Sequence, residues 1–108
     1  MIIEQKLYNL IKTTNGQLNR FPKHEKQSLV CQIRNAQLSL LRLIISTKKK
    51  YYKKTTLRDM DIELDVLRCL YRLSFDFGYI DVKRYENISI KINELGRMVG
   101  AWLNTVRE

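Results

Sequence analysis

The stretch LRDMDIELDVLRCLYRLSFDFGYI, residues 57–80, has two apolar faces at helical spacing. The first face repeats at steps of three and four, which places its members on one side of an α-helix. Its members are Leu57, Met60, Leu64, Leu67, Tyr71, Ser74 and Gly78. The second face, on another side of the same helix, consists of Ile62, Val66, Cys69, Leu73 and Ile80. A helix in a small bundle usually needs one apolar stripe, so a second face predicts either a very central helix or an interface between subunits.

We favour the interface, and we expect its contacts to come from four residues of the second face. They are Ile62, Val66, Cys69 and Leu73. The protein is therefore expected to be a homo-oligomer.

The composition predicts a single all-α domain over residues 1–108. The chain has one proline and four glycines, and no run alternates apolar and polar residues as a solvent-facing strand does. A chain of this length buries roughly two thirds of its unfolded surface, so it needs neither a metal ion nor a disulfide to hold the fold. Cys31 and Cys69 lie within apolar helical patterns, and we expect both to be reduced and inside the core.

Three further helices are expected around residues 57–80. Residues 2–19 and about 26–47 carry apolar residues at helical spacing, and Gln37 is expected on the polar side of the second of these helices. The last helix, after Asp81, has the most regular apolar period in the chain. Four helices with short connections predict an antiparallel up-down-up-down four-helix bundle.

The predicted helix boundaries have local signals. Pro22 separates the first two helices, because a proline pushes the residue before it out of the helical region. Thr56 and Asp59 resemble a capping box at the start of the third helix. Gly78 is a natural left-handed residue at the end of that helix, and Asp81 is a good N-cap for the fourth.

Basic residues outnumber acidic ones by 20 to 11, which gives a formal charge of +9. A surplus of this size favours an anionic partner, with nucleic acid the first candidate, although a membrane surface also attracts cations. The charge is most concentrated between Arg42 and Arg58, where seven basic residues and no acidic residue occur.

This basic segment has two interpretations, which we weigh evenly. Its cations can displace counter-ions from a phosphate backbone, and Tyr51 and Tyr52 can stack on unpaired bases. Alternatively, it is a solvated loop whose lysines bind the last carbonyls of the preceding helix. The candidate nucleic-acid contacts here are Lys48, Lys49, Lys50, Lys53, Lys54 and Arg58.

No pattern in the chain predicts an enzyme, a metal site or a cofactor. His24 is the single histidine, and no nucleophile or orienting carboxylate can be paired with it from spacing. A di-metal bundle needs Glu-x-x-His pairs, which one histidine cannot supply. The N-terminus lacks a secretory signal, and the longest nearly apolar run, residues 38–45, is too short to span a bilayer. We therefore expect a non-catalytic protein that stays in the cytoplasm, away from the membrane.

Four segments together resemble a known family. They are FPKHEK (residues 21–26), QIRN (32–35), LRDMDIEL (57–64) and ELGRMVGAW (94–102). In this order and spacing they resemble the accessory variability determinant proteins of diversity-generating retroelements. The wider relatives are small four-helix-bundle proteins encoded in intervening sequences of bacterial 23S ribosomal RNA genes. The resemblance covers nearly all of the chain from Leu7 onward.

The resemblance implies a ring-shaped homopentamer with a basic surface. Members of that family bind nucleic acid and the retroelement's reverse transcriptase, and they support error-prone copying of a template RNA into complementary DNA without catalysing it. Lys23 and Arg34 fall inside the matching motifs and join the candidate nucleic-acid contacts. Two alternatives remain open: a protein of a ribosomal RNA intervening sequence that binds ribosomal RNA, and a purely structural oligomer.

Overall fold

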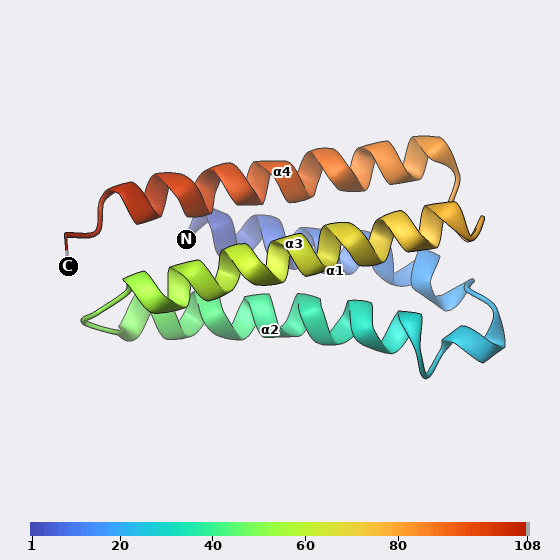
Figure 1. Cartoon of the computed structure of the whole chain (residues 1–108), viewed down its shortest axis with the longest axis horizontal. Coiled ribbons are helices and arrows are strands. Elements are labelled where there is room, and N and C mark those ends of the chain that lie inside the picture. The colour runs from blue at the N-terminus through green and yellow to red at the C-terminus, as the bar shows by residue number, and fades with distance from the viewer. Residues whose placement is uncertain (108) are drawn as a thin grey trace.

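The computed structural model describes residues 1–107, and in this range the regular secondary structure consists of four long helices and one short 3-10 helix (Figure 1). The elements in chain order are α1 (Ile2–Asn19), η1 (Lys23–Glu25), α2 (Leu29–Lys49), α3 (Lys54–Asp76) and α4 (Val82–Asn104). The predicted all-α fold with four helices is confirmed.

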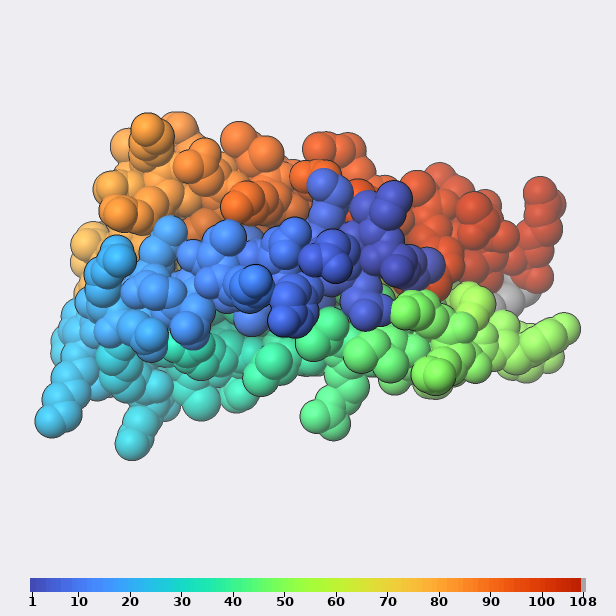
Figure 2. Space-filling model, turned by 180° about the vertical axis from the view of Figure 1, so that it is seen from behind, coloured from blue at the N-terminus to red at the C-terminus, as the bar shows by residue number. Residues whose placement is uncertain are grey.

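The four helices form an elongated bundle with extents of 44 × 25 × 20 Å. Each helix packs against its neighbours in the sequence, and α4 also packs against α1, which closes the bundle. The helices alternate in direction (Figure 1), so the arrangement is the predicted up-down-up-down bundle. The loop between α2 and α3 therefore lies at the same end as the end of α4, as Figure 2 also shows from behind.

The first apolar face of α3 lies in the core, as the sequence predicts. Its five large residues are each at most 1% exposed: Leu57, Met60, Leu64, Leu67 and Tyr71. Ile80, which the sequence places on the second face, is also buried, because it lies beyond the end of α3 where the chain turns toward α4.

The second face of α3 is exposed in the single chain. Ile62 is 60% exposed, and Val66 and Leu73 are each 42% exposed. Cys69 is exposed among them, so its predicted place inside the core is wrong, and Cys31 is only half-buried. Both cysteines are free, as expected. The alternative of a very central α3 is excluded for the single chain, since nothing in residues 1–107 covers this face.

A buried polar cluster joins three helices. Gln37 is 1% exposed, so its predicted position on the polar side of α2 is wrong. Its Oε1 accepts a hydrogen bond of 2.5 Å from the Tyr71 hydroxyl of α3 and a longer one of 3.5 Å from Thr14 of α1. Burial raises the pKa of Tyr71 to about 12, because the phenolate would lose its hydration. A glutamine oxygen is tolerated in the core when it accepts hydrogen bonds in this way.

The helix boundaries agree with the sequence signals in part. The turn after α3 is confirmed, with Gly78 at φ 79°, and Asp81 caps α4 by accepting a 2.8 Å bond from the Arg84 amide. The capping box at Thr56 is wrong, because α3 begins earlier, at Lys54, and the Thr56 hydroxyl instead donates to a backbone carbonyl. Among the described residues, no helix combines the length and apolarity needed to cross a membrane.

Substitution Tyr71→Phe removes the donor to Gln37 while keeping the ring volume. We expect it to lower the free energy of unfolding by about 1–3 kcal/mol, since a buried acceptor is left with only a weak partner. Urea unfolding followed by circular dichroism measures this loss. The control Tyr8→Phe, at an exposed tyrosine of α1, should stay within about 0.5 kcal/mol of the unmodified protein. Equal stability of both variants would contradict a structural role for the buried cluster.

Candidate nucleic-acid interface

The predicted basic segment forms one end of the bundle. Its lysines occupy the last turn of α2, the connecting loop and the first turn of α3. Six of the eight candidate contacts gather here: Lys48, Lys49, Lys50, Lys53, Lys54 and Arg58. Lys49, Lys50 and Arg58 are exposed, and Lys54 is half-buried. The α2–α3 loop and the two helix ends beside it therefore bring several cations close together, and no acidic residue occurs between residues 42 and 58.

Lys53 has a structural role within this segment. Its ammonium donates hydrogen bonds of 2.7 Å to the Thr47 carbonyl and 2.6 Å to the Lys50 carbonyl, and it lies 3.4 Å from the Lys48 carbonyl. The Thr47 carbonyl accepts only a longer 3.3 Å bond from the Lys50 amide, because α2 ends here and its last carbonyls lack the usual helical partners. A positive charge at this position also offsets the negative end of the helix dipole. The alternative interpretation of a carbonyl-binding lysine is therefore confirmed for Lys53.

Lys48 is also engaged within the chain. Its ammonium lies 2.6 Å from Glu4 Oε1, in an ion pair that joins α2 to α1. The hydrogen bond from Lys48 lowers the pKa of the Glu4 carboxyl, since it favours the charged form. The cations of the segment that are best placed for an external anion are therefore the exposed Lys49, Lys50 and Arg58.

The other two candidates lie away from this end. Arg34 is in the second turn of α2, about 22 Å from Lys49 at 1.5 Å per residue. Its guanidinium donates to the Asn15 side chain at 2.7 Å and to the Asn19 side chain at 3.0 Å, which ties α2 to α1. Lys23 is exposed in η1, at the opposite end of the bundle (Figure 1). The structure does not bring either residue into the basic end.

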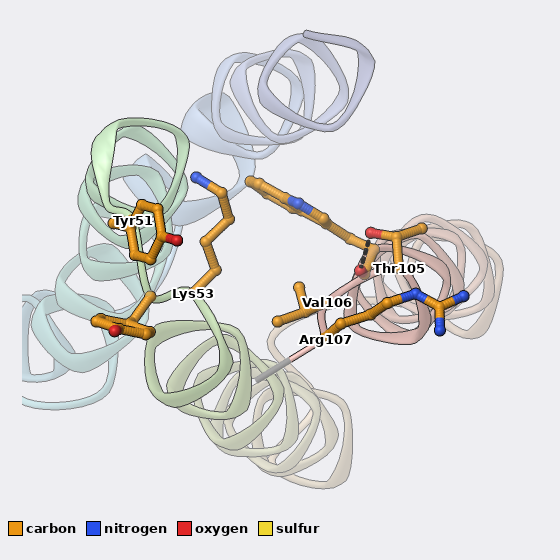
Figure 3. A pocket seen from close by; sticks show the side chains of 7 residues that line it. Tyr51, Lys53, Thr105, Val106 and Arg107 are labelled. Atoms are coloured by element: carbon orange, nitrogen blue, oxygen red, sulfur yellow. Dashed lines mark hydrogen bonds between the residues drawn. The ribbon is translucent and has the colours of Figure 1, made fainter.

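An open cavity of about 370 Å³ lies between the α2–α3 loop and the end of α4 (Figure 3). Its walls are Tyr51, Tyr52, Lys53, Trp102, Thr105, Val106 and Arg107. In Figure 3, Lys53 lies between Tyr51 and the segment that contains Thr105 and Val106, and the Arg107 guanidinium points away from the loop. The Thr105 hydroxyl donates a 2.6 Å bond to the Trp102 carbonyl and so fixes the turn after α4.

Four residues of this cavity were not among the predicted site residues: Trp102, Thr105, Val106 and Arg107. Trp102 belongs to the apolar stripe of α4, and it packs against the core as well as lining the cavity. The signal that could have found it is the topology, because an up-down-up-down bundle brings the end of the fourth helix beside the loop between the second and third.

This end of the bundle carries groups that can bind an anionic or aromatic ligand. Cations and aromatic rings lie together, and none of the described residues that line the cavity is a carboxylate. Within residues 1–107, no cluster of three or more histidine, cysteine, aspartate and glutamate side chains is arranged to hold a metal ion. Lysines and arginines at such a surface neutralise phosphates, and aromatic rings accept stacked bases.

These features define a class, the small basic four-helix-bundle proteins with an uncovered apolar helix face. Within that class the chain belongs to the bAvd-like family, because the family model matches residues 1–106. The match confirms the resemblance to accessory variability determinant proteins that the four sequence segments indicate. No match to the chain was found among curated proteins.

At the basic end, Lys53 binds backbone carbonyls whereas Lys50 is exposed, so we expect their substitutions to change the stability by different amounts. Lys53→Met should lower the free energy of unfolding by about 1 kcal/mol, because the last carbonyls of α2 lose a charged donor. Lys50→Met, at an exposed position, should change stability by less than about 0.5 kcal/mol. Urea unfolding of both variants tests this assignment. A larger loss for Lys50→Met than for Lys53→Met would overturn it.

Proposed function

We propose that this protein is the non-catalytic accessory protein of a diversity-generating retroelement. It binds nucleic acid and associates with the reverse transcriptase and its template RNA or complementary DNA, and so supports mutagenic copying. The observation that carries the proposal is membership of the bAvd-like family together with the concentration of cations at one end of the bundle. Family membership favours this function over that of a ribosomal RNA intervening-sequence protein.

In this proposal the basic end holds the phosphate backbone. The exposed Lys49, Lys50 and Arg58 make the direct contacts, while Lys53 keeps the loop in shape. Contacts to phosphate position a protein on nucleic acid without reading its sequence, so catalysis and base selection belong to the polymerase.

Assembly is the second component of the proposal. The exposed apolar face of α3, with Ile62, Val66, Cys69 and Leu73, packs against further copies of the chain and forms a homopentamer. Burial of such a face is favourable by roughly 25 cal/mol per Å² of apolar surface, and large exposed apolar patches are uncommon on monomers. Several copies then present several basic ends to one polyanion, which raises the overall affinity.

The phosphate-contact proposal predicts the salt dependence of binding. The double variant Lys49→Gln/Lys50→Gln should bind a 20-base-pair DNA duplex more weakly at low salt. Its slope of log affinity against log salt concentration should be shallower by about 1.8 per site, because about 0.9 of a counter-ion is released for each phosphate contact. Fluorescence anisotropy at several salt concentrations measures both quantities.

The control for this experiment is Lys83→Gln/Lys91→Gln, which removes the same charge from exposed positions of α4. It should leave the slope nearly unchanged. Equal losses of affinity from the two double variants would mean that the total charge of the protein, and not the position of these lysines, drives binding. A salt-independent affinity would overturn the nucleic-acid role altogether.

The assembly proposal is tested by two matched substitutions. Ile62 on the second face of α3 and Ile90 on α4 are each 60% exposed in the single chain. Ile62→Asp should dissociate the oligomer, because it places a charge in an apolar contact, whereas Ile90→Asp should leave assembly intact. Sedimentation equilibrium at micromolar concentration measures the mass of each. A monomeric unmodified protein, or an oligomer that survives Ile62→Asp, would refute this interface.

A further inference from the structure

The cavity at the basic end combines features that the phosphate contacts do not explain. Three aromatic residues from two distant parts of the sequence line it: Tyr51 and Tyr52 from the α2–α3 loop, and Trp102 from the last turn of α4. The two tyrosines are 87% and 70% exposed, and their rings pack edge to face with centroids 4.8 Å apart. Large aromatic side chains that remain this exposed are not needed for the core.

The two walls of the cavity differ in how firmly they are held. Trp102 is half-buried and packs against the core, so one wall is fixed by the bundle itself. The opposite wall is a short loop, and its shape is held by Lys53, whose ammonium bonds the carbonyls of Thr47 and Lys50. Lys53 is therefore a positioning residue for Tyr51 and Tyr52.

We propose that this cavity binds one unstacked nucleobase of single-stranded RNA or DNA. The base stacks against Trp102 and the Tyr51–Tyr52 pair, and the adjoining phosphates lie against Lys49, Lys50 and Arg107. This inference rests on the proposed nucleic-acid role and specifies its substrate as a single strand.

Size and chemistry support this ligand class. A volume of about 370 Å³ lies at the lower end of the range of about 300–1,000 Å³ that is usual for small-molecule sites, which suits one base with its sugar. Among residues 1–107, the lining contains lysine and arginine side chains and no carboxylate, which suits an anionic strand. In a duplex the base faces are covered by neighbouring pairs, and only an unpaired base can expose a face to aromatic side chains.

The experiment compares single-stranded and duplex probes on the complete protein at one fixed salt concentration. The probes are a 12-nucleotide oligo(U), a 12-nucleotide oligo(dT) and a DNA hairpin with a 12-base-pair stem. Affinity is measured by fluorescence anisotropy, and stacking is measured separately with unlabelled probes through the fluorescence of Trp102, the single tryptophan in the chain.

The variant is Tyr51→Leu/Tyr52→Leu, which retains apolar bulk but removes both exposed rings. We expect about tenfold weaker binding of the single-stranded probes and less than twofold change for the hairpin, since each stacked base contributes about 1–3 kcal/mol. Quenching of Trp102 by oligo(U) or oligo(dT) should decrease in parallel. Tyr51→Phe/Tyr52→Phe should retain the affinity of the unmodified protein, because phenylalanine preserves the stacking surface.

The matched control is Tyr8→Leu, at a tyrosine of α1 that is 52% exposed and lies outside the cavity. It should alter none of the affinities. Equal losses for the hairpin and the single strands, or unquenched Trp102 fluorescence at saturation, would overturn the inference. Tighter binding of oligo(U) than of oligo(dT) would support RNA as the natural strand, and the reverse order would support DNA.

The outcomes also separate this inference from the proposed function. If the hairpin binds and the leucine variant has the same affinity for all three probes as the unmodified protein, the single-strand site is wrong while the phosphate-binding role stands. If none of the three probes binds, even when the fixed salt concentration is low, the proposed function is overturned together with the site.

Discussion

The packing of α3 against α2 is the contact on which the rest of this molecule depends. The inner stripe of α3 is fully buried there, and the Tyr71 hydroxyl bonds Gln37 of α2 inside the same contact. Because a polar pair of this kind costs free energy if the helices slide past one another, it favours one register among the many that apolar side chains alone would tolerate. That register fixes the loop between the two helices, and with it the position of the basic segment. It also directs the second face of α3, including Ile62, away from the core.

The formal charge of +9 does not measure the charge that is available to a partner. Several cations hold the bundle together: Lys26 bonds the last carbonyls of α1 at 2.9 and 2.5 Å, and Lys53 does the same for α2. Lys6 pairs with Glu94 at 2.6 Å across α1 and α4, and Lys48 pairs with Glu4. A C-terminal helix end attracts a positive charge, so these lysines would be retained even in a protein without an anionic partner. The cations that have no such role in the fold are therefore the ones that indicate an anionic partner.

The sequence allowed most of the fold to be predicted, because helices depend on local periodicity. The apolar stripes, the left-handed Gly78 and the Asp81 cap all act within a few residues, and each was found where the pattern indicated. The errors have a common cause, since burial depends on which elements pack together. Gln37 was predicted on the polar side of α2 but lies on the inward side. Cys69 was predicted in the core but lies on the exposed face of α3. The first turn of α3 was predicted as loop because Lys54, Thr55 and Thr56 carry no apolar period.

The sequence by itself determined that this chain is an all-helical basic protein, that one helix has an apolar face in excess of what a core requires, and that its cations concentrate between residues 42 and 58. Only the tertiary structure decided how those cations divide between holding the bundle and facing solvent, and that Trp102 meets the Tyr51–Tyr52 loop across a cavity. The physical reason is that helix formation and charge are local properties of the chain. Contacts between residues some fifty positions apart exist only after burial has fixed the direction and register of the helices.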